Sequence, residues 1–359
     1  MQKDLKIYFK KKKVEIDKII EKYLPQRATR KWLKFTFGKP RYTFFKKKEI
    51  EKAILNPAWN FLKRGGKRWR AVLFLLLTEA VGGNVKKIKD FALLPELIHN
   101  GAIIIDDIED QGELRRGKKC LHRIFGIDLA LNLGNFLYFF PLLILLKNER
   151  KFKKETLLKA FRCYLQEMTN LHCGQGIDIL WHKGKERNIS EKEYLQMTAF
   201  KTGALSRMVA KLGVILSRKD EKLAEKMGKF AEAIGIAFQI QDDILDITLA
   251  EKEREKFGKA FGNDIKEGKR SLVVIYTLKK ANKKDRKRLI GILDKSKKSS
   301  KDVKEAISII KKYRSVSEAK KIAQRLVKEA WKKIDKILPE SKSKNLLKEF
   351  ANFLIERKI

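Results

Sequence analysis

Apolar residues recur at helical spacing along most of this 359-residue chain, the pattern of helices that bury one face. Only 6 prolines and 21 glycines interrupt the pattern, and no strand-like alternation is long enough to build a sheet. With 43% hydrophobic residues, the chain can bury a large core. The sequence therefore predicts an all-α fold.

The first 48 residues differ in composition from the rest. They are basic and mixed, and they predict only a short helix from Val14 to Leu24, stopped by Pro25 and followed by irregular chain. We therefore divide the chain into a basic N-terminal extension, residues 1–48, and a helical domain, residues 49–359. The longer helices expected in that domain cover Ala71 to Val81, Leu93 to Asp110, Leu129 to Leu146, Thr156 to Leu180, Glu191 to Leu216 and Leu223 to Leu249. Lysine-rich amphipathic helices are expected after residue 271, with a loop at residues 295–301.

The chain is strongly basic. Its 84 lysines and arginines exceed its 44 acidic residues by 40, and a field of that sign attracts diphosphates, nucleic acid or an anionic membrane surface. The basic residues are spread along the chain, without an arginine-rich arm or zinc-finger spacing. We therefore assign most of the lysines to solvated helix surfaces and expect no nucleic-acid partner. Peripheral contact with an anionic membrane stays open.

Cysteine usage and the apolar runs indicate a cytoplasmic protein. Cys120, Cys163 and Cys173 are odd in number and lack a CxxC pair, so neither a disulfide framework nor a structural zinc site is expected. The N-terminus has no apolar signal core. The longest apolar run, Phe136 to Leu146, is too short to span a bilayer and contains Pro141.

Two DDxxD clusters follow apolar stretches of predicted helix. The first runs from Asp106 to Asp110 after Ala-Ile-Ile-Ile, and the second runs from Asp242 to Asp246 after Ile-Ala-Phe-Gln-Ile-Gln. Residues four apart share a helical face, so Asp106 and Asp110 are expected to point the same way. Such carboxylates are costly at the end of an apolar helix unless something neutralises them. One cluster alone would be explained by solvation, but a repeat of the same pattern indicates a site.

Carboxylates without nearby histidine or thiolate ligands suit magnesium, which keeps several waters and completes its shell with substrate phosphates. We therefore expect the two clusters to face each other across a cavity and to bind Mg²⁺. Cations would then hold the phosphates, arginine by bidentate contacts and lysine as a point charge. The candidates are the glycine turn Gly65-Gly66-Lys67-Arg68-Trp69-Arg70, the pair Arg115-Arg116, Lys201 beside Thr202, and Lys269.

Over about residues 56–275, five segments of the chain resemble, in the same order, motifs of the trans-isoprenyl diphosphate synthases, or polyprenyl synthetases. The similar segments are GGKRWR, LIHNGAIIIDDIEDQGELRRGK, KTG, FQIQDDILD and FGNDIKEGKRS. With GQGIDILW, they are most similar to geranylgeranyl diphosphate synthases. The resemblance implies a single-domain helical bundle of the isoprenoid synthase type, with a central active-site cavity, that forms a homodimer. Ala71, Lys119 and Asn135 depart from the family pattern without removing a magnesium ligand or a phosphate contact.

The resemblance also implies a role for each matching residue. Magnesium would be bound, directly or through water, by Asp106, Asp107, Asp110, Asp242, Asp243 and Asp246. The allylic diphosphate would be held by Arg115, Lys201, Gln239, Lys259 and Lys269. Isopentenyl diphosphate would be bound by Lys67, Arg70, His99 and Arg116. Thr202 would lie near the reacting carbon. The remaining histidines, which show no metal spacing, are expected to be structural: His122, His172 and His182.

The implied reaction is a magnesium-assisted ionisation of an allylic diphosphate, followed by attack of the isopentenyl alkene on the carbocation. Three other functions fit the sequence less well. A terpene cyclase would carry a different second metal site. A regulatory subunit of a heteromeric synthase tends to lose aspartates, and this chain keeps both clusters. A helical nucleic-acid-binding protein would explain the charge but not the paired acids.

The expected product is geranylgeranyl diphosphate, with a longer polyprenyl or a farnesyl diphosphate as alternatives. Gly101 and Ala102, five and four residues before Asp106, are small where an aromatic side chain blocks the tunnel in farnesyl-type members. The tunnel floor is then expected deeper, at Leu94, Ile98 or an aromatic among Phe136, Tyr138 and Phe139. The alternative is that Gly101 only allows another helix to approach closely.

Overall fold

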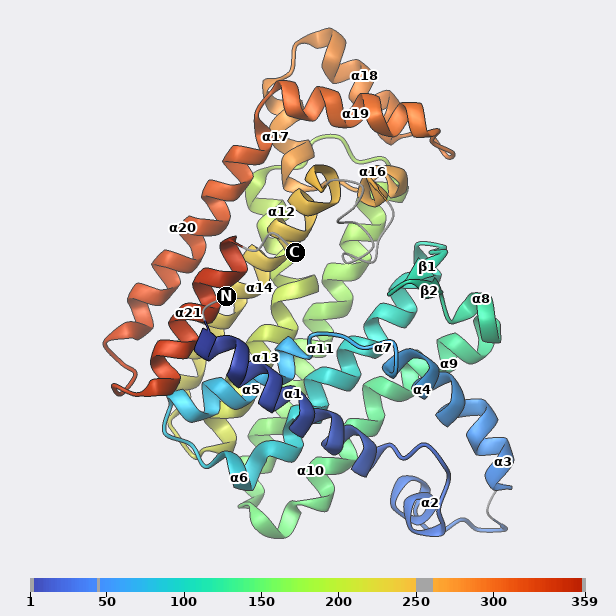
Figure 1. The fold of residues 1–359 in the computed structure, drawn as a ribbon, viewed down its shortest axis with the longest axis vertical. Coiled ribbons are helices and arrows are strands. Elements are labelled where there is room, and N and C mark those ends of the chain that lie inside the picture. Colours follow the sequence, from blue (N-terminus) through green and yellow to red (C-terminus); the bar gives the residue numbers. More distant parts are fainter. Residues whose placement is uncertain (1–2, 44–45, 250–260, 357–359) are drawn as a thin grey trace.

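The computed structural model describes residues 3–43, 46–249 and 261–356, and these are almost entirely helical (Figure 1). Helices of the N-terminal half are α1 Lys3–Tyr23, α2 Arg30–Phe37, α3 Lys47–Ile50, α4 Asn56–Leu62, α5 Trp69–Ala80, α6 Val85–Ile88, α7 Leu93–Glu109, α8 His122–Phe125, α9 Ile127–Phe139 and α10 Leu143–Lys147. Those of the C-terminal half are α11 Lys154–Lys183, α12 Glu191–Thr198, α13 Ala204–Leu216, α14 Glu221–Thr248, α16 Asn263–Glu267, α17 Leu272–Lys280, α18 Lys283–Leu293, α19 Ser300–Lys312, α20 Ser315–Asp335 and α21 Lys342–Glu356. The all-α prediction is confirmed.

Shorter elements interrupt or join these helices. Two are π-helical turns, η1 Glu51–Leu55 and η5 Ala199–Gly203. Three are 3₁₀ turns, η2 Lys89–Ala92, η3 Phe140–Leu142 and η4 Glu149–Lys151. Strands β1 Leu114–Arg115 and β2 Lys118–Lys119 pair antiparallel in a small hairpin that follows α7.

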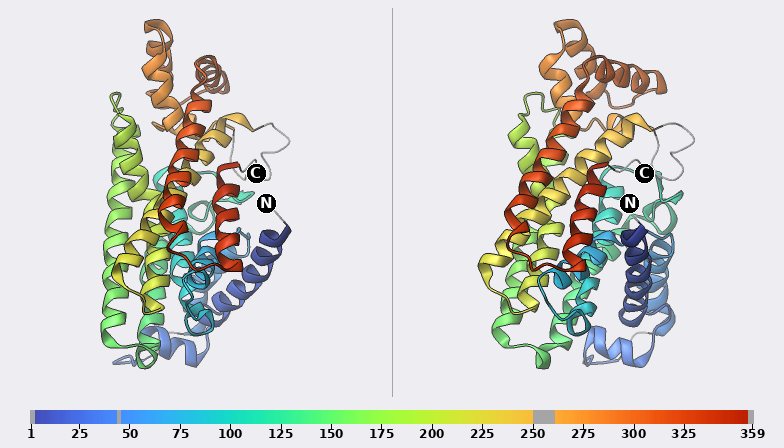
Figure 2. Two further views of the ribbon diagram at one scale, coloured as in Figure 1. Left: turned by 90° about the vertical axis from the view of Figure 1, so that its left-hand side faces the viewer. Right: turned by 60° about the vertical axis from the view of Figure 1, so that its left-hand side comes forward.

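The long helices form the centre of the bundle. Helix α13 packs against both α11 and α14, and α20 covers α14 on the outside (Figure 2). Helix α7 packs against α9, α5 and α13. This arrangement brings the ends of α7 and α14, which carry the two acidic clusters, to the same part of the bundle.

The helix expected over Leu129 to Leu146 is divided. Helix α9 ends at Phe139, η3 follows, and α10 begins at Leu143. Pro141 explains the break, because proline has no backbone N–H to continue the hydrogen-bond ladder. The stretch Ile127–Lys147 is long and apolar enough, by length and composition, to cross a membrane, but half of its most apolar part is buried inside the protein. A place in the helical core therefore accounts for only half of that composition.

The N-terminal segment is more helical than expected. Helix α1 starts at Lys3 instead of Val14, and α2 occupies a region that we expected to be irregular. The many lysines of α1 made the helical spacing of its apolar residues hard to recognise. Only a few residues on one face of the helix are buried: Leu5, Ile16, Ile19, Ile20 and Tyr23. These side chains join the same hydrophobic core as the rest of the chain. The division at residue 48 therefore reflects a change of composition, not a gap between two cores.

Truncating a buried side chain of α1 should weaken the whole fold. Ile16 is 0% exposed, so Ile16→Ala should lower the free energy of unfolding by about 2–5 kcal/mol, through lost burial and a cavity. Val14, on the same helix, is 53% exposed. Val14→Ala should therefore change the free energy of unfolding by less than about 0.5 kcal/mol. Urea unfolding followed by circular dichroism measures both. Equal stability of the two variants would show that α1 unfolds separately from the core.

Candidate active site

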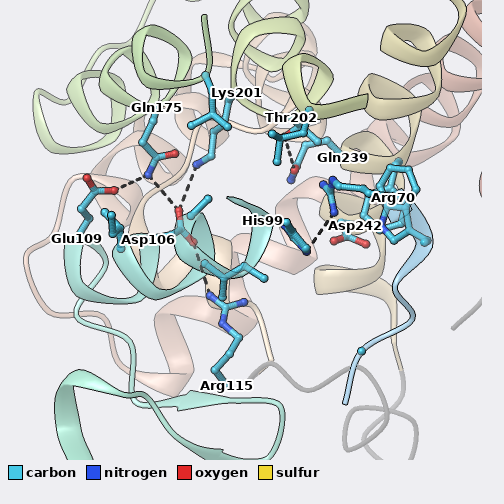
Figure 3. Close-up of a pocket in the computed structure, with 18 of the residues that line it drawn as sticks. Arg70, His99, Asp106, Glu109, Arg115, Gln175, Lys201, Thr202, Gln239 and Asp242 are labelled. Atoms are coloured by element: carbon cyan, nitrogen blue, oxygen red, sulfur yellow. Dashed lines mark hydrogen bonds and ion pairs between the residues drawn. The ribbon is translucent and has the colours of Figure 1, made fainter. Parts of the chain in front are cut away.

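A central cavity of about 350 Å³ lies between α7, α9, α11, η5, α13 and α14 (Figure 3). Its polar lining residues are Lys67, Arg70, His99, Asp106, Glu109, Arg115, Arg116, Gln175, Lys201, Thr202, Gln239 and Asp242. Its apolar lining includes Ala102, Ile103, Ile105, Tyr138, Leu171, Leu205 and Phe238. Ten of the sequence-predicted polar residues therefore meet in one space, together with Ala102.

Asp106 is the aspartate of the first cluster that faces this cavity. Gln175 donates to Asp106 Oδ1 over 3.1 Å and to Glu109 Oε2 over 2.7 Å, so one α11 amide bridges both carboxylates. Lys201 Nζ lies 3.6 Å from Asp106 Oδ1, and Arg115 lies 3.6 Å from its other oxygen. Burial alone would raise the pKa of Asp106, but the charges of Lys201, Lys269 and Arg115 outweigh it and hold that pKa below its usual range. The carboxylate is therefore ionised.

Asp107 and Asp110 point elsewhere. Asp107 is 2% exposed, and Arg115 binds its Oδ1 through Nε at 2.8 Å and Nη2 at 2.5 Å. Asp110 lies just beyond the end of α7 and pairs with Lys269 over 3.1 Å. Burial raises the pKa of Asp110 to about 6, although the charge of Lys269 opposes the rise. The Asp110 N–H bonds to the Asp106 carbonyl over 2.9 Å, as residues four apart on a helix do, so the expected common face of the two residues stays a prediction. Only Asp106 lines the central cavity, where Glu109 lies beside it.

The second cluster divides in the same way. Asp242 lines the central cavity, across from Asp106 (Figure 3). Asp243 is 5% exposed and accepts hydrogen bonds from Tyr194 over 2.7 Å and from Gln239 over 2.9 Å. Asp246 accepts the backbone N–H groups of residues 263 and 264, each over 3.1 Å. Each cluster thus presents one aspartate to the cavity, and its other aspartates bind groups of the protein.

Lys201 reaches the cavity from the π-helical turn η5, and π turns inside helices frequently mark functional sites. Its Nζ lies 2.6 Å from Asp178 on α11. Burial alone would lower the pKa of Lys201, but the charges of Asp178 and Asp106 outweigh it and raise that pKa. A Cβ on Gly174 would lie 2.3 Å from the Lys201 backbone nitrogen. The glycine therefore lets α11 approach the turn closely.

The glycine turn of GGKRWR has the backbone that its sequence suggests. Gly65 and Gly66 have φ values of 88° and 136°, which favour glycine.

Arg70 donates to His99 Nε2 over 3.1 Å. Burial and the charges of Arg70 and Arg116 lower the pKa of His99 well below its usual value, so the ring is neutral and accepts this bond.

Several residues in or beside the cavity were missed or misjudged from the sequence. Gln175 and Asp178 belong to GQGIDILW, but we assigned them no role. His172 was expected to be structural, yet it lines the cavity and its ring meets that of Tyr138 at 5.2 Å between centroids. The helical spacing of Leu171, Gln175 and Asp178 places them on one face and is the signal that would have found them. Lys259 lies outside the described residues.

Gly101 packs against α9 instead of lining the cavity. A Cβ there would lie 2.8 Å from the Gly134 carbonyl oxygen and 3.1 Å from Leu137 Cβ. This contact favours the close-packing alternative for Gly101. Ala102, in contrast, does line the cavity.

The donor set fits a hard cation that keeps water. Among the described residues, no group of three or more histidine, cysteine or acidic side chains is close enough to hold a metal by itself. Asp106 and Asp242 instead offer carboxylate oxygens from different walls of one cavity. Magnesium usually takes one or two carboxylates, with waters and substrate phosphates filling its other positions.

Comparisons with known proteins show the family of this chain. Residues 51–310 match the family described as Polyprenyl synthetase. This chain belongs to that family. A geranylgeranyl pyrophosphate synthase of Geoglobus acetivorans is 32% identical over 311 residues, which cover 87% of this chain and 93% of that protein. A geranylgeranyl diphosphate synthase of Methanosarcina mazei is 36% identical over 221 residues, 62% of this chain and 66% of that protein.

The fold is also that of the family. A crystal structure of geranylgeranyl pyrophosphate synthetase from Pyrococcus horikoshii superposes with a TM-score of 0.83 at 32% identity, covering 99% of this chain and 100% of that one. The predicted helical bundle of the isoprenoid synthase type is confirmed, and the chain is a trans-prenyltransferase.

The close contact of Gly101 can be tested by adding one methyl group. Gly101→Ala should lower the free energy of unfolding by about 1–3 kcal/mol, because α7 and α9 must move apart. Gly291 lies within α18 with no atom near its Cβ position, so Gly291→Ala should be neutral or stabilising by up to about 1 kcal/mol. Urea unfolding measures both. A Gly101→Ala protein as stable as the parent would contradict the packing role.

Proposed function

We propose that the enzyme joins isopentenyl diphosphate to allylic diphosphates (dimethylallyl, geranyl and farnesyl) with the help of Mg²⁺, and that its main product is geranylgeranyl diphosphate. The central cavity carries this proposal. Part of its wall holds acidic side chains from two helices together with basic side chains, and the rest is lined by apolar side chains. A diphosphate head with a hydrocarbon tail matches that division. The names of the relatives support the product.

The chain's own residues would bind and orient the allylic diphosphate. Lys201 and Arg115 lie beside Asp106, where their charges suit phosphate oxygens. Asp106 and Asp242 would hold magnesium, which when bound neutralises the departing diphosphate. Leu205 and Phe238 line the same cavity and would keep water from the carbocation. Direct metal contact by the other four aspartates of the clusters is also part of this proposal.

Isopentenyl diphosphate would bind at the GGKRWR end of the cavity. Lys67, Arg70, His99 and Arg116 all line this space. Arg116 also donates to the Gly65 carbonyl over 2.7 Å, which fixes the glycine turn. Burial lowers the pKa of Arg70 and of Arg116 to about 10, so both are still cationic at neutral pH.

The apolar part of the cavity supports a product of limited length. Ala102, one helical turn before Asp106, adds little bulk to the wall. Tyr138 and His172 line the same cavity, and their rings are in contact. We propose that this aromatic pair forms the floor of the tunnel, with Tyr138 being one of the residues considered from the sequence.

We also propose that the enzyme is a cytoplasmic homodimer. Two helices carry exposed apolar side chains, namely Ile127, Leu131 and Phe139 on α9 and Leu158 and Leu165 on α11. Exposed apolar side chains that form one patch are typical of a protein interface, and we propose that these do. The high positive charge additionally favours peripheral contact with an anionic membrane.

Removing either cavity-facing carboxylate should abolish most activity. Asp106→Asn and Asp242→Asn should each lower turnover by at least about 100-fold, because each removes charge that the metal needs. Asp128→Asn, at an exposed acid of α9, is the matched control and should keep full turnover. The assay incubates enzyme, Mg²⁺, labelled isopentenyl diphosphate and each allylic diphosphate, and separates the products by chromatography. Near-normal turnover in either cavity variant would remove its metal role.

Opening the proposed floor should lengthen the product. Tyr138→Ala should shift the products from geranylgeranyl diphosphate towards longer chains, since the tail gains room. Phe136→Ala is the control, because Phe136 stacks on Phe140 at 5.0 Å and does not line the cavity. Chromatography of dephosphorylated products gives the chain length. An unchanged product from an active Tyr138→Ala enzyme would place the floor elsewhere.

A further inference from the structure

Tyr194 lies behind the active site on α12 and does not line the central cavity. Its side chain is buried, and its hydroxyl donates to Asp243 Oδ2 over 2.7 Å. Burial, reinforced by the Asp243 charge, raises the pKa of Tyr194 well above its ordinary value of 10.0. The phenol is therefore protonated and is a donor towards this carboxylate.

The hydrogen bond to the second oxygen of Asp243 fixes the orientation of the Gln239 amide. Oδ1 accepts from Gln239 Nε2 over 2.9 Å. An amide NH₂ group only donates hydrogen bonds, and in Gln239 this group faces Asp243. The amide oxygen must then point the other way, where it accepts from Thr202 Oγ1 over 3.0 Å (Figure 3). Hydrogen bonds thus connect a buried phenol to two side chains on the cavity wall.

The network also joins two separate parts of the fold. Tyr194 and Thr202 belong to the continuous segment formed by α12 and η5, whereas Gln239 and Asp243 lie one turn apart on α14. Tyr194 therefore fixes α14 against the segment that carries Lys201 and Thr202. Loss of its hydroxyl would remove one of the bonds that hold the Asp243 carboxylate in its orientation towards Gln239.

We propose that Tyr194 is a positioning residue of the allylic site, acting through Asp243 on the amide of Gln239 and the hydroxyl of Thr202. This inference rests on the proposed binding of the allylic diphosphate beside Gln239 and Thr202. It assigns Asp243 an orienting role in addition to any contact with metal. Isopentenyl diphosphate, bound at the GGKRWR end, is outside the network.

Tyr194→Phe tests the proposal, because it keeps the ring and removes only the hydroxyl. Tyr276→Phe is the matched control: Tyr276 is also buried and also donates to a carboxylate over 2.7 Å, but that carboxylate belongs to Glu191 on α12 and not to Asp243. Steady-state kinetics are measured with each substrate varied in turn, together with Tm. We expect the KM for farnesyl diphosphate to rise about 10-fold in Tyr194→Phe, with the KM for isopentenyl diphosphate changed less than about twofold.

A merely structural role would give a different result. It would lower Tm or the active fraction, and with it kcat, while leaving both KM values as in Tyr276→Phe, and this outcome would overturn the proposal. An inactive parent enzyme would instead refute the proposed function. Adding Tyr194→Phe to Thr202→Val provides a second measurement, since residues in one network are not additive. The added change should then raise the farnesyl diphosphate KM by less than it does alone, and full additivity would also overturn the proposal.

Discussion

The site depends on mutual neutralisation of charges that are buried or half-buried. Asp106, Asp178 and Asp110 would be costly to bury alone, and Lys201 and Lys269 compensate them at 2.6–3.6 Å. Burial disfavours the charge of each lysine, yet the surrounding carboxylates raise the pKa of both. These residues lie at or beside the cavity in which we propose that diphosphates and magnesium bind, so charges of both signs are already held there by the protein.

That compensation depends in turn on close backbone packing. Lys201 reaches both Asp178 and Asp106 because η5 lies directly against α11 at Gly174. One face of α11 then supplies Gln175 to the first acidic cluster and Asp178 to the lysine. A side chain at Gly174 would separate these elements, and the ion pairs would lengthen with them.

The sequence was sufficient to predict the helical class, both acidic clusters and ten polar residues of the cavity, because helical periodicity and motif order are local signals. It ended the helix of the first acidic cluster at Asp110, which in the structure is the residue just after α7. It gave no sign of the π turn at Lys201, and it raised close packing at Gly101 only as an alternative, without naming Gly134 as the partner. Both features are set by the neighbouring helices. Periodicity identifies the face of a helix, but the partner of that face comes from the tertiary fold.

The polar and apolar parts of the cavity are held by different interactions. In the polar part, hydrogen bonds and ion pairs link α7, α11, η5 and α14, so a change in one side chain affects several others. In the apolar part, His172 bonds to the Met168 carbonyl of its own helix and meets Tyr138 by ring contact. Packing of that kind tolerates a change of side-chain size better than a charged network does. If the proposed floor on α9 and α11 sets the product length, substitutions there can change it while the polar residues of the cavity keep their positions.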